Sequence, residues 1–206
     1  MAKIKVMIAD DHALVRMGLR LLISQQKDLT LVGEAEDGEQ AIALVAKEHP
    51  DVAVLDLQMP VVDGTQATDR IRTEFPGTKV IILTSYITSD GISHALEKGA
   101  TGAILKSETE TALIEAIRLA SEGKSYITKE IEAQIASDPP VKDLSPRQLQ
   151  IIDGLTRGLS NAEIGEMLGI DRFTVKNHLV ALFQKLGAAN RSEAIAIALR
   201  KHLIKG

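Results

Sequence analysis

The chain has 206 residues, of which 45% are hydrophobic and 25% charged, with a formal net charge of −4 and no cysteine. This composition is that of a globular protein and excludes a disordered or fibrous chain, and the lack of cysteine excludes disulfides and thiolate metal sites. Because the sequence carries neither a charged-then-apolar leader nor an uninterrupted apolar run of about 18 residues, we expect a cytoplasmic protein without a membrane partner.

Short apolar runs alternate with amphipathic stretches over the first 123 residues. Runs such as 80–83 show no polar alternation, which is typical of strands buried on both faces. An amphipathic stretch such as Leu14, Met17, Leu21 and Leu22 predicts a helix, and strands separated by helices form right-handed βαβ units around a parallel sheet. We therefore predict an α/β, flavodoxin-like (βα)5 domain with strands at 4–8, 29–35, 52–55, 80–83 and 102–105.

Polar residues follow four of these strands, and in an open parallel sheet this edge is where ligands bind. Each residue alone is compatible with a helix cap or a solvated charge, but together they supply three carboxylates, a hydroxyl and an ammonium group. Such a set fits a divalent cation and a phosphoryl group, which a carboxylate accepts to give an aspartyl phosphate. The candidate site residues are Asp10, Asp11, Asp56, Thr84 and Lys106.

These residues carry a resemblance over positions 3–123. The chain is similar there to the receiver domain of bacterial two-component response regulators, in the motifs Asp10-Asp11, Asp56-Leu-Gln-Met-Pro60, Asp63-Gly64, Thr84-Ser85 and Lys106. The resemblance implies that Asp56 accepts a phosphoryl group from a phosphohistidine of a sensor histidine kinase. It also implies a Mg²⁺ ion whose direct ligands are Asp11, Asp56 and the backbone carbonyl of Gln58, with Asp10 as a ligand through water.

The same resemblance makes Thr84 and Lys106 the sensors of the bound phosphoryl group. It allows at most Mg²⁺-dependent self-phosphorylation and self-dephosphorylation, so we do not expect an enzyme. One position departs from the family pattern: Ala103 stands three residues before Lys106, where the family usually has Tyr or Phe. We hypothesise that Tyr86, in the loop after Thr84, partly replaces that aromatic ring.

Residues 124–143 are predicted to form a linker between two domains. The consecutive prolines Pro139 and Pro140 lack N–H donors and favour an extended spacer. Residues 129–135 have the pattern of a short helix that could belong to either side.

Residues 144–206 differ from the first part in charge and in pattern. They contain nine Lys and Arg against five Asp and Glu, a net charge of +4, which leaves −8 for residues 1–143. N-cap motifs recur with a Gln or Glu three residues on, as in Ser145-Pro146-Arg-Gln148, Ser160-Asn-Ala-Glu163 and Asn190-Arg-Ser-Glu193. We therefore predict an all-α domain of four helices, at 146–157, 161–168, 172–186 and 191–204.

The second and third of these helices are predicted to form a helix-turn-helix, with Gly169-Ile170-Asp171 as the turn. A recognition helix reads base edges with exposed residues near its N-terminus, which makes Lys176 and Asn177 the candidates for base contacts. Arg172 and Asn161 are candidates for phosphate contacts, which position a protein on DNA. The full candidate DNA-binding set is Asn161, Arg172, Thr174, Lys176, Asn177 and Val180.

The second domain is similar to the LuxR-type DNA-binding domain. The resemblance rests on Leu144-Ser-Pro-Arg-Gln148, Gly158-Leu-Ser-Asn-Ala-Glu-Ile-Gly165, Leu168-Gly-Ile170, Thr174-Val-Lys-Asn-His178, Leu186-Gly187 and Asn190-Arg-Ser-Glu-Ala194. With the receiver, it implies a response regulator of the NarL/FixJ subfamily, a transcription factor that binds double-stranded DNA. It also implies a homodimer on phosphorylation or DNA binding, in which the last helix packs against its copy, although a fourth core helix is the alternative.

Two other functions remain open at this point. A haloacid-dehalogenase-like hydrolase or phosphotransferase would need a second Asp two residues after Asp56 as general acid, and that position is Gln58. A phosphate-independent interaction module is the second alternative. Ala103 favours this module and the intact acidic site argues against it.

Overall fold

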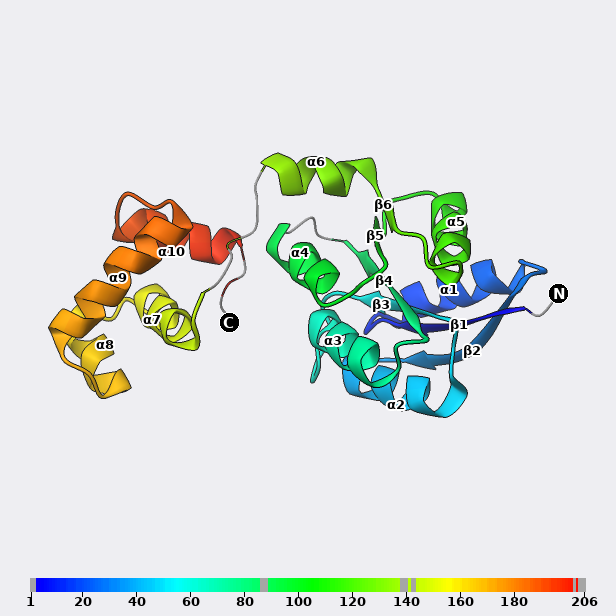
Figure 1. The fold of residues 1–206 in the computed structure, drawn as a ribbon, viewed down its shortest axis with the longest axis horizontal. Helices are drawn as coiled ribbons and strands as arrows, with labels where there is room; N and C mark the ends of the chain where they lie inside the picture. Colours follow the sequence, from blue (N-terminus) through cyan, green and yellow to red (C-terminus); the bar gives the residue numbers. More distant parts are fainter. Residues whose placement is uncertain (1–2, 86–88, 138–140, 142–143, 202, 204–206) are drawn as a thin grey trace. The chain divides into compact units, whose positions relative to one another are not determined.

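The computed structural model describes residues 3–85, 89–137, 141, 144–201 and 203. The chain forms two compact units, Met1–Asp138 and Pro139–Gly206, the first built on a sheet and the second helical (Figure 1). None of the helices in these described ranges has the length and apolar character needed to cross a membrane.

The first unit contains a parallel sheet in the order β2-β1-β3-β4-β5-β6. This order confirms the flavodoxin-like fold, in which β2 lies on one side of β1 and the later strands lie on the other. Valine, isoleucine and leucine dominate the central strands because both faces are covered there, as the unbroken apolar runs predict. The strands are Ile4–Ala9 (β1), Leu29–Ala35 (β2), Val52–Asp56 (β3), Lys79–Thr84 (β4), Gly102–Leu105 (β5) and Tyr126–Ile127 (β6).

Helices cover both faces of this sheet and enclose two hydrophobic cores (Figure 1). Helices α1 (Ala13–Ser24) and α5 (Glu110–Ser121) contribute Leu19, Ile114 and Ile117 to the core on one face. The core on the other face is covered by α2 (Gly38–Glu48), α3 (Gly64–Glu74) and α4 (Ser89–Glu97). The central strands are thereby removed from water, and their carboxyl ends are left at one edge.

Helix α1 exists where the apolar spacing predicts it, but it turns much of that apolar stripe to solvent. Leu14, Met17 and Leu21 are 79%, 60% and 61% exposed, while Leu19 and Ile23 are buried against the sheet. Apolar residues occur on more than one side of this helix, so their spacing alone does not identify the face that is buried. The exposed stripe is a surface feature of the first unit.

The boundary between the units lies later in the chain than the first domain predicted from sequence. Residues 126–127 form β6, which pairs in parallel with β5, and Lys129–Ser137 forms α6, whose Ile131 is fully buried in the first core. The expected linker over 124–143 is therefore only partly a linker. Its short helix belongs to the first unit because burial of Ile131 and the partly buried Ile135 holds it there.

The second unit consists of helices whose first turns are capped by their own side chains. Ser145 and Gln148 form a capping box, and Ser160 and Glu163 form another, as the N-cap motifs predict. Leu155, Ile164, Leu182 and other apolar side chains form one core. The helices are α7 (Pro146–Thr156), α8 (Asn161–Leu168), α9 (Arg172–Leu186) and α10 (Arg191–Arg200), close to the predicted ranges apart from the shorter α10.

The turn between α8 and α9 depends on Gly165. A Cβ atom at this position would lie 2.6 Å from the backbone oxygen of Ile170, closer than a carbon and an oxygen can approach. We expect Gly165→Ala to lower the free energy of unfolding of the second unit by about 1–3 kcal/mol. The measurement is urea unfolding of the full chain followed by far-UV circular dichroism.

Tyrosine fluorescence supplies the internal control, because both tyrosines, Tyr86 and Tyr126, lie in the first unit and the chain has no Trp. The tyrosine transition should not shift in Gly165→Ala. Gly18→Ala is the matched variant: no atom lies within 4 Å of its Cβ, so it should stabilise α1 by about 0.5–1 kcal/mol. Equal stability of Gly165→Ala and the wild type would contradict the steric argument.

Candidate functional sites

The carboxyl edge of the sheet brings together four of the predicted site residues. Asp10 follows β1, Asp56 ends β3, Thr84 ends β4 and Lys106 follows β5. Asp10, Asp56 and Thr84 are only 1%, 5% and 1% exposed. Adjacent strands hold these side chains in place, since the backbone N–H of Lys106 donates to the carbonyl oxygen of Thr84 at 2.8 Å.

The ammonium group of Lys106 bridges two buried carboxylates. Its Nζ atom lies 2.6 Å from Oδ2 of Asp10 and 3.0 Å from Oδ2 of Asp56. Burial would lower the pKa of Lys106, but the two carboxylates outweigh this effect and raise it above its ordinary value. The lysine therefore stays charged within the site.

Burial has the opposite consequence for Asp56. It raises the pKa of the carboxyl group, and the bond with Lys106 only partly offsets this. The ionised carboxylate is thus destabilised relative to water, which is the condition in which a cation or a new covalent bond at this group is favoured.

The acidic cluster has the composition of a site for a hard cation. Potential ligand atoms of Asp10, Asp11, His12 and Asp56 all lie within 4.8 Å of one another. Carboxylate oxygens at a partly exposed site, with Asp11 accessible to water, are the donors that Mg²⁺ prefers. Gln58, the other predicted ligand, is exposed two residues after Asp56, and its role stays a prediction.

Two further residues contact this cluster, and the sequence pattern did not predict a role for either. Nδ1 of His12 lies 2.6 Å from Oδ1 of Asp11. Arg16 is 9% exposed, and its Nη1 donates to the carbonyl oxygen of Asp10 at 2.7 Å while Nη2 pairs with Glu36. Arg16 lies in α1, six residues after Asp10. Helical spacing alone does not distinguish it from the other residues of that helix.

The turn after Asp56 requires a residue without a side chain. A Cβ atom on Gly64 would lie 2.2 Å from the carbonyl oxygen of Asp56, and the N–H of Gly64 donates to the carbonyl of Leu57 at 2.9 Å. Asp63 caps α3 by accepting from the N–H of Gln66. The Asp63-Gly64 pair therefore lets α3 begin directly against the strand that carries Asp56.

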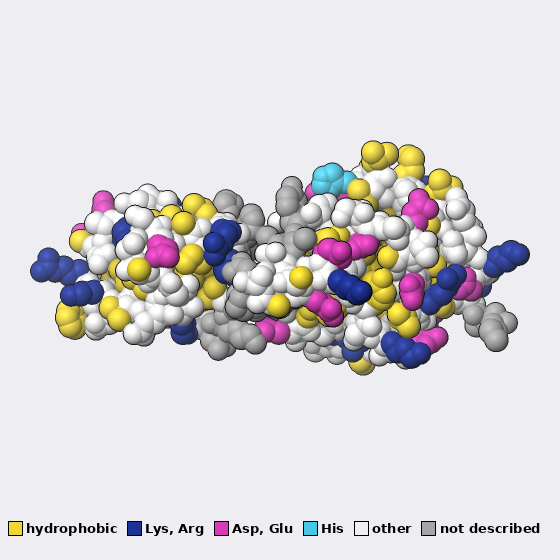
Figure 2. Space-filling view, turned by 90° about the horizontal axis from the view of Figure 1, so that it is seen from above, with side chains coloured by type: hydrophobic (Ala, Val, Ile, Leu, Met, Phe, Trp, Pro, Cys, Tyr) yellow, Lys and Arg dark blue, Asp and Glu magenta, His cyan; other side chains and the backbone are white. Residues whose placement is uncertain are grey.

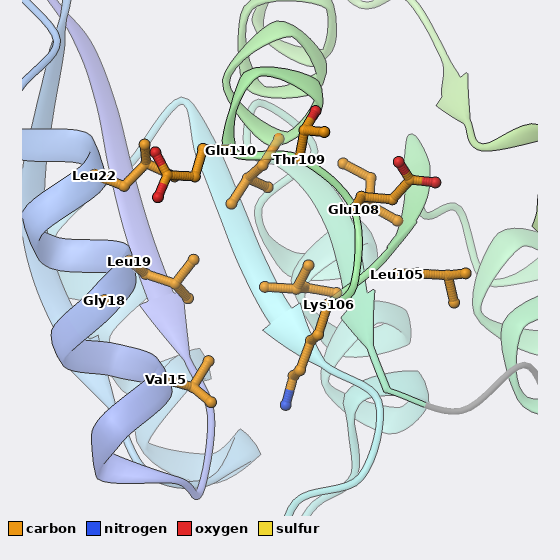
Figure 3. Close-up of a pocket in the computed structure, with 12 residues that line it drawn as sticks. Val15, Gly18, Leu19, Leu22, Leu105, Lys106, Glu108, Thr109 and Glu110 are labelled. Atoms are coloured by element: carbon orange, nitrogen blue, oxygen red, sulfur yellow. The ribbon is translucent and has the colours of Figure 1, made fainter.

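A pocket of about 230 Å³ adjoins the acidic site, between α1 and the start of α5 (Figure 3). Its lining is mainly apolar, with Val15, Leu19 and Leu113 among the residues, and it also includes Glu108 and Glu110. Lys106 also lines it, so this side chain belongs both to the pocket and to the ion pairs with the carboxylates.

The usual aromatic switch position holds a small side chain. Ala103 is fully buried in β5. Tyr86, which we suggested as a partial replacement, lies outside the described residues. The coupling between Thr84 and an aromatic ring therefore stays a hypothesis.

In the second unit, α9 presents the predicted base-reading residues to solvent. Val175, Leu179 and Leu182 are buried, and Arg172, Lys176, Asn177 and Val180 are exposed. Lys and Arg side chains project from the helical unit at the left of Figure 2, consistent with its net charge of +4. A helix with such an exposed face can enter the major groove of DNA.

The remaining DNA-contact candidates differ in their surroundings. Oγ1 of Thr174 donates to the capping carboxylate of Asp171 at 2.6 Å, which lowers the pKa of Asp171 and engages Thr174 within the protein. Asn161 is half-buried at the first position of α8. In the same helix Ala162 is exposed, whereas Ile164 is buried.

Two family models match the chain, one in each unit. The response regulator receiver domain matches residues 6–118, and the bacterial regulatory proteins of the luxR family match residues 142–198. The transcriptional regulatory protein LiaR of Bacillus subtilis (strain 168) is 35% identical, with 98% of this chain and 99% of that protein covered. The oxygen regulatory protein NreC of Staphylococcus carnosus (strain TM300) is also 35% identical, with coverage of 97% and 99%.

Solved structures agree with these matches. The response regulator ChrA of a heme-sensing two-component system is 38% identical, with a TM-score of 0.60 and coverage of 99% of this chain and 100% of that one. RcsB of Salmonella enterica serovar Typhimurium, bound to a promoter in the presence of phosphomimetic BeF₃⁻, is 27% identical, with a TM-score of 0.71 and coverage of 96% and 98%.

The raised pKa of Asp56 predicts how an Asp56→Asn variant depends on pH. The wild-type carboxyl group binds its proton more tightly in the folded state, so ionisation costs stability as pH rises from the unfolded value, near 3.8, through the folded pKa. In a chelating buffer, Asp56→Asn should therefore gain stability over the wild type as pH rises through this range. Lys106 keeps its pair with Asp10 in the variant.

Thermal unfolding followed by tyrosine fluorescence between acidic and neutral pH is the measurement. Asp69→Asn, which removes a half-exposed carboxylate on α3, is the control. If the two variants differ from the wild type by the same amount at every pH, burial of Asp56 does not have the assigned effect.

Proposed function

The chain belongs to the two-component response regulators with a LuxR-type DNA-binding domain, which are transcriptional regulators and not classical enzymes, and we propose that phosphorylation of Asp56 controls its binding to DNA. The observation that carries the proposal is the position of Asp56 at the end of β3, buried and 3.0 Å from the ammonium group of Lys106.

The chemistry is a phosphoryl transfer to a carboxylate. An oxygen of Asp56 attacks phosphorus, the new O–P bond forms, and the N–P bond of a phosphohistidine on a sensor histidine kinase breaks. The imidazole leaves with the electron pair and takes up a proton. Lys106 offers positive charge to the transferred oxygens, and the hydroxyl of Thr84 at the neighbouring strand end supplies a donor to the same group.

We assign a Mg²⁺ ion to the acidic cluster, held by Asp11, Asp56 and the backbone carbonyl of Gln58, with Asp10 acting through water. When bound, the ion neutralises charge on the phosphoryl oxygens. The same residues permit at most slow self-phosphorylation by a small phosphodonor and self-dephosphorylation.

The second unit reads the DNA. Lys176 and Asn177 are assigned to base edges, with Val180 beside them, and Arg172 and Asn161 to phosphates. A homodimer would place two such units on two half-sites related by two-fold symmetry. In α10, Ala194, Ile197 and Ala198 are buried in the core of the unit, and Leu199 is exposed and available for contact with a second copy. Because bacterial DNA lies in the cytoplasm, the regulator acts there.

Phosphorylation should strengthen DNA binding about 5- to 150-fold, the usual range of coupling between two sites. The experiment incubates the full chain with acetyl phosphate and Mg²⁺ and measures binding to genomic fragments and molar mass in parallel. Wild type should bind more tightly and as a dimer after treatment, and Asp56→Ala should not respond.

Asp69→Ala is the matched control, since it removes a carboxylate of the same unit away from the site. It should respond as the wild type does. Equal DNA binding by wild type in every condition would keep the DNA-binding function and reject phosphorylation as its control.

Contacts to phosphates and to bases should separate by their salt dependence. Arg172→Ala should weaken binding to all sequences alike and lower the slope of log K against log salt by about 1. Asn177→Ala should instead change which base is preferred at one position. Titrations at several salt concentrations measure both effects.

Arg157→Ala, at the exposed end of α7, is the control cation and should leave the slope unchanged. A change in base preference in Arg172→Ala with an unchanged slope would overturn the assignment of Arg172 to a phosphate.

A further inference from the structure

We propose that Phe173 is a specificity-determining residue that contacts the methyl group of a thymine in the major groove. Phe173 is the second residue of α9 and is 66% exposed. The inference requires DNA binding by the second unit but not phosphorylation of the first.

Packing within the protein does not account for this phenylalanine. The chain has three phenylalanines, and the other two, Phe75 and Phe183, are partly buried against hydrophobic cores. An exposed aromatic ring on a charged helix keeps apolar surface in water, which is unfavourable unless another molecule covers it.

The helix periodicity places Phe173 on the surface that faces DNA. Lys176, Asn177 and Val180 follow it at i+3, i+4 and i+7, so all four side chains lie along one side of α9. The stripe has an apolar residue at each end, with Val180 52% exposed, and polar residues between. The thymine methyl is the apolar group that the major groove offers, and Phe is one of the side chains that contact it.

The cap of α9 favours the groove, and not the phosphate backbone, as the contact of Phe173. The Asp171 carboxylate accepts from the N–H groups of Phe173 at 2.8 Å and Thr174 at 3.0 Å. These backbone donors are therefore not available to a phosphate, which leaves the side chain of Arg172 as the phosphate contact at this end of the helix. The same bonds hold the backbone of Phe173, so only side-chain freedom is lost when the ring is ordered on DNA.

The stripe also sets where the thymine lies. Phe173 and Asn177 are four residues apart, about 6 Å along the helix axis. This spacing corresponds to roughly two base-pair steps of 3.4 Å. The thymine is therefore expected within a few base pairs of the base that Asn177 reads.

The test begins with selection of binding sites from a library of randomised duplexes, using the full chain and Phe173→Ala. The wild type should select a thymine at a defined position of each half-site. The variant should lose the preference there and keep it elsewhere. Leu149→Ala, which truncates an exposed leucine of α7, is the matched control and should select the same sites as wild type.

Replacement of that thymine by deoxyuracil then removes only the methyl group. Wild type and Leu149→Ala should each lose about fourfold in affinity, the effect of one buried carbon, and Phe173→Ala should lose nothing. Affinity for an unselected duplex should be equal for all three proteins. This arm separates a lost methyl contact from a general loss of DNA binding.

Other results would overturn the proposal. If no thymine of the selected site is sensitive to deoxyuracil in the wild type, the ring does not contact a methyl group, whatever the stability of the variants. If Phe173→Ala stays sensitive and Val180→Ala does not, the contact belongs to Val180. If Phe173→Ala changes the molar mass of the DNA complex but no base preference, the ring contacts protein instead.

Discussion

One ammonium group between two buried carboxylates holds the carboxyl edge of the first unit together. Lys106 directly follows β5, Asp10 directly follows β1 and Asp56 ends β3, so the contact joins the carboxyl ends of three strands. Without the lysine, two acidic groups would face each other out of water, which is strongly unfavourable. An anion bound at Asp56 competes with both carboxylates for the same charge, which links the occupancy of the site to the arrangement of the strand ends.

Much of this architecture is readable from the sequence because it follows from local patterns. Unbroken apolar runs identify the strands, and side-chain caps identify the starts of the helices. The carboxyl edge of a parallel sheet is a place where ligands bind, so residues at strand ends such as Asp56 and Lys106 are predicted from sequence to share one site. Helical periodicity identified the exposed face of α9.

Other features depend on contacts between distant segments, which local patterns do not contain. The buried face of α1 was not evident, because Leu14 and Leu19 are equally apolar and only the sheet decides which is covered. Strand β6 has two residues and exists through its pairing with β5. Arg16 reached the site unnoticed, since its bond to the carbonyl of Asp10 is a property of the folded backbone.

The capped helices of the second unit also bear on how the chain folds. Ser160, Asp171 and Asn190 each satisfy the N–H groups of their own helix within three residues. The contacts of α7 with α8, of α8 with α9 and of α9 with α10 join segments close in sequence, so little chain entropy is lost in closing them, whereas α7 and α10 pack together across the length of the unit. The sheet of the first unit places β1 between β2 and β3, and each connection between consecutive strands contains a helix. Because parallel strands pair only after such a crossover has been closed, we expect the first unit to fold more slowly than the second.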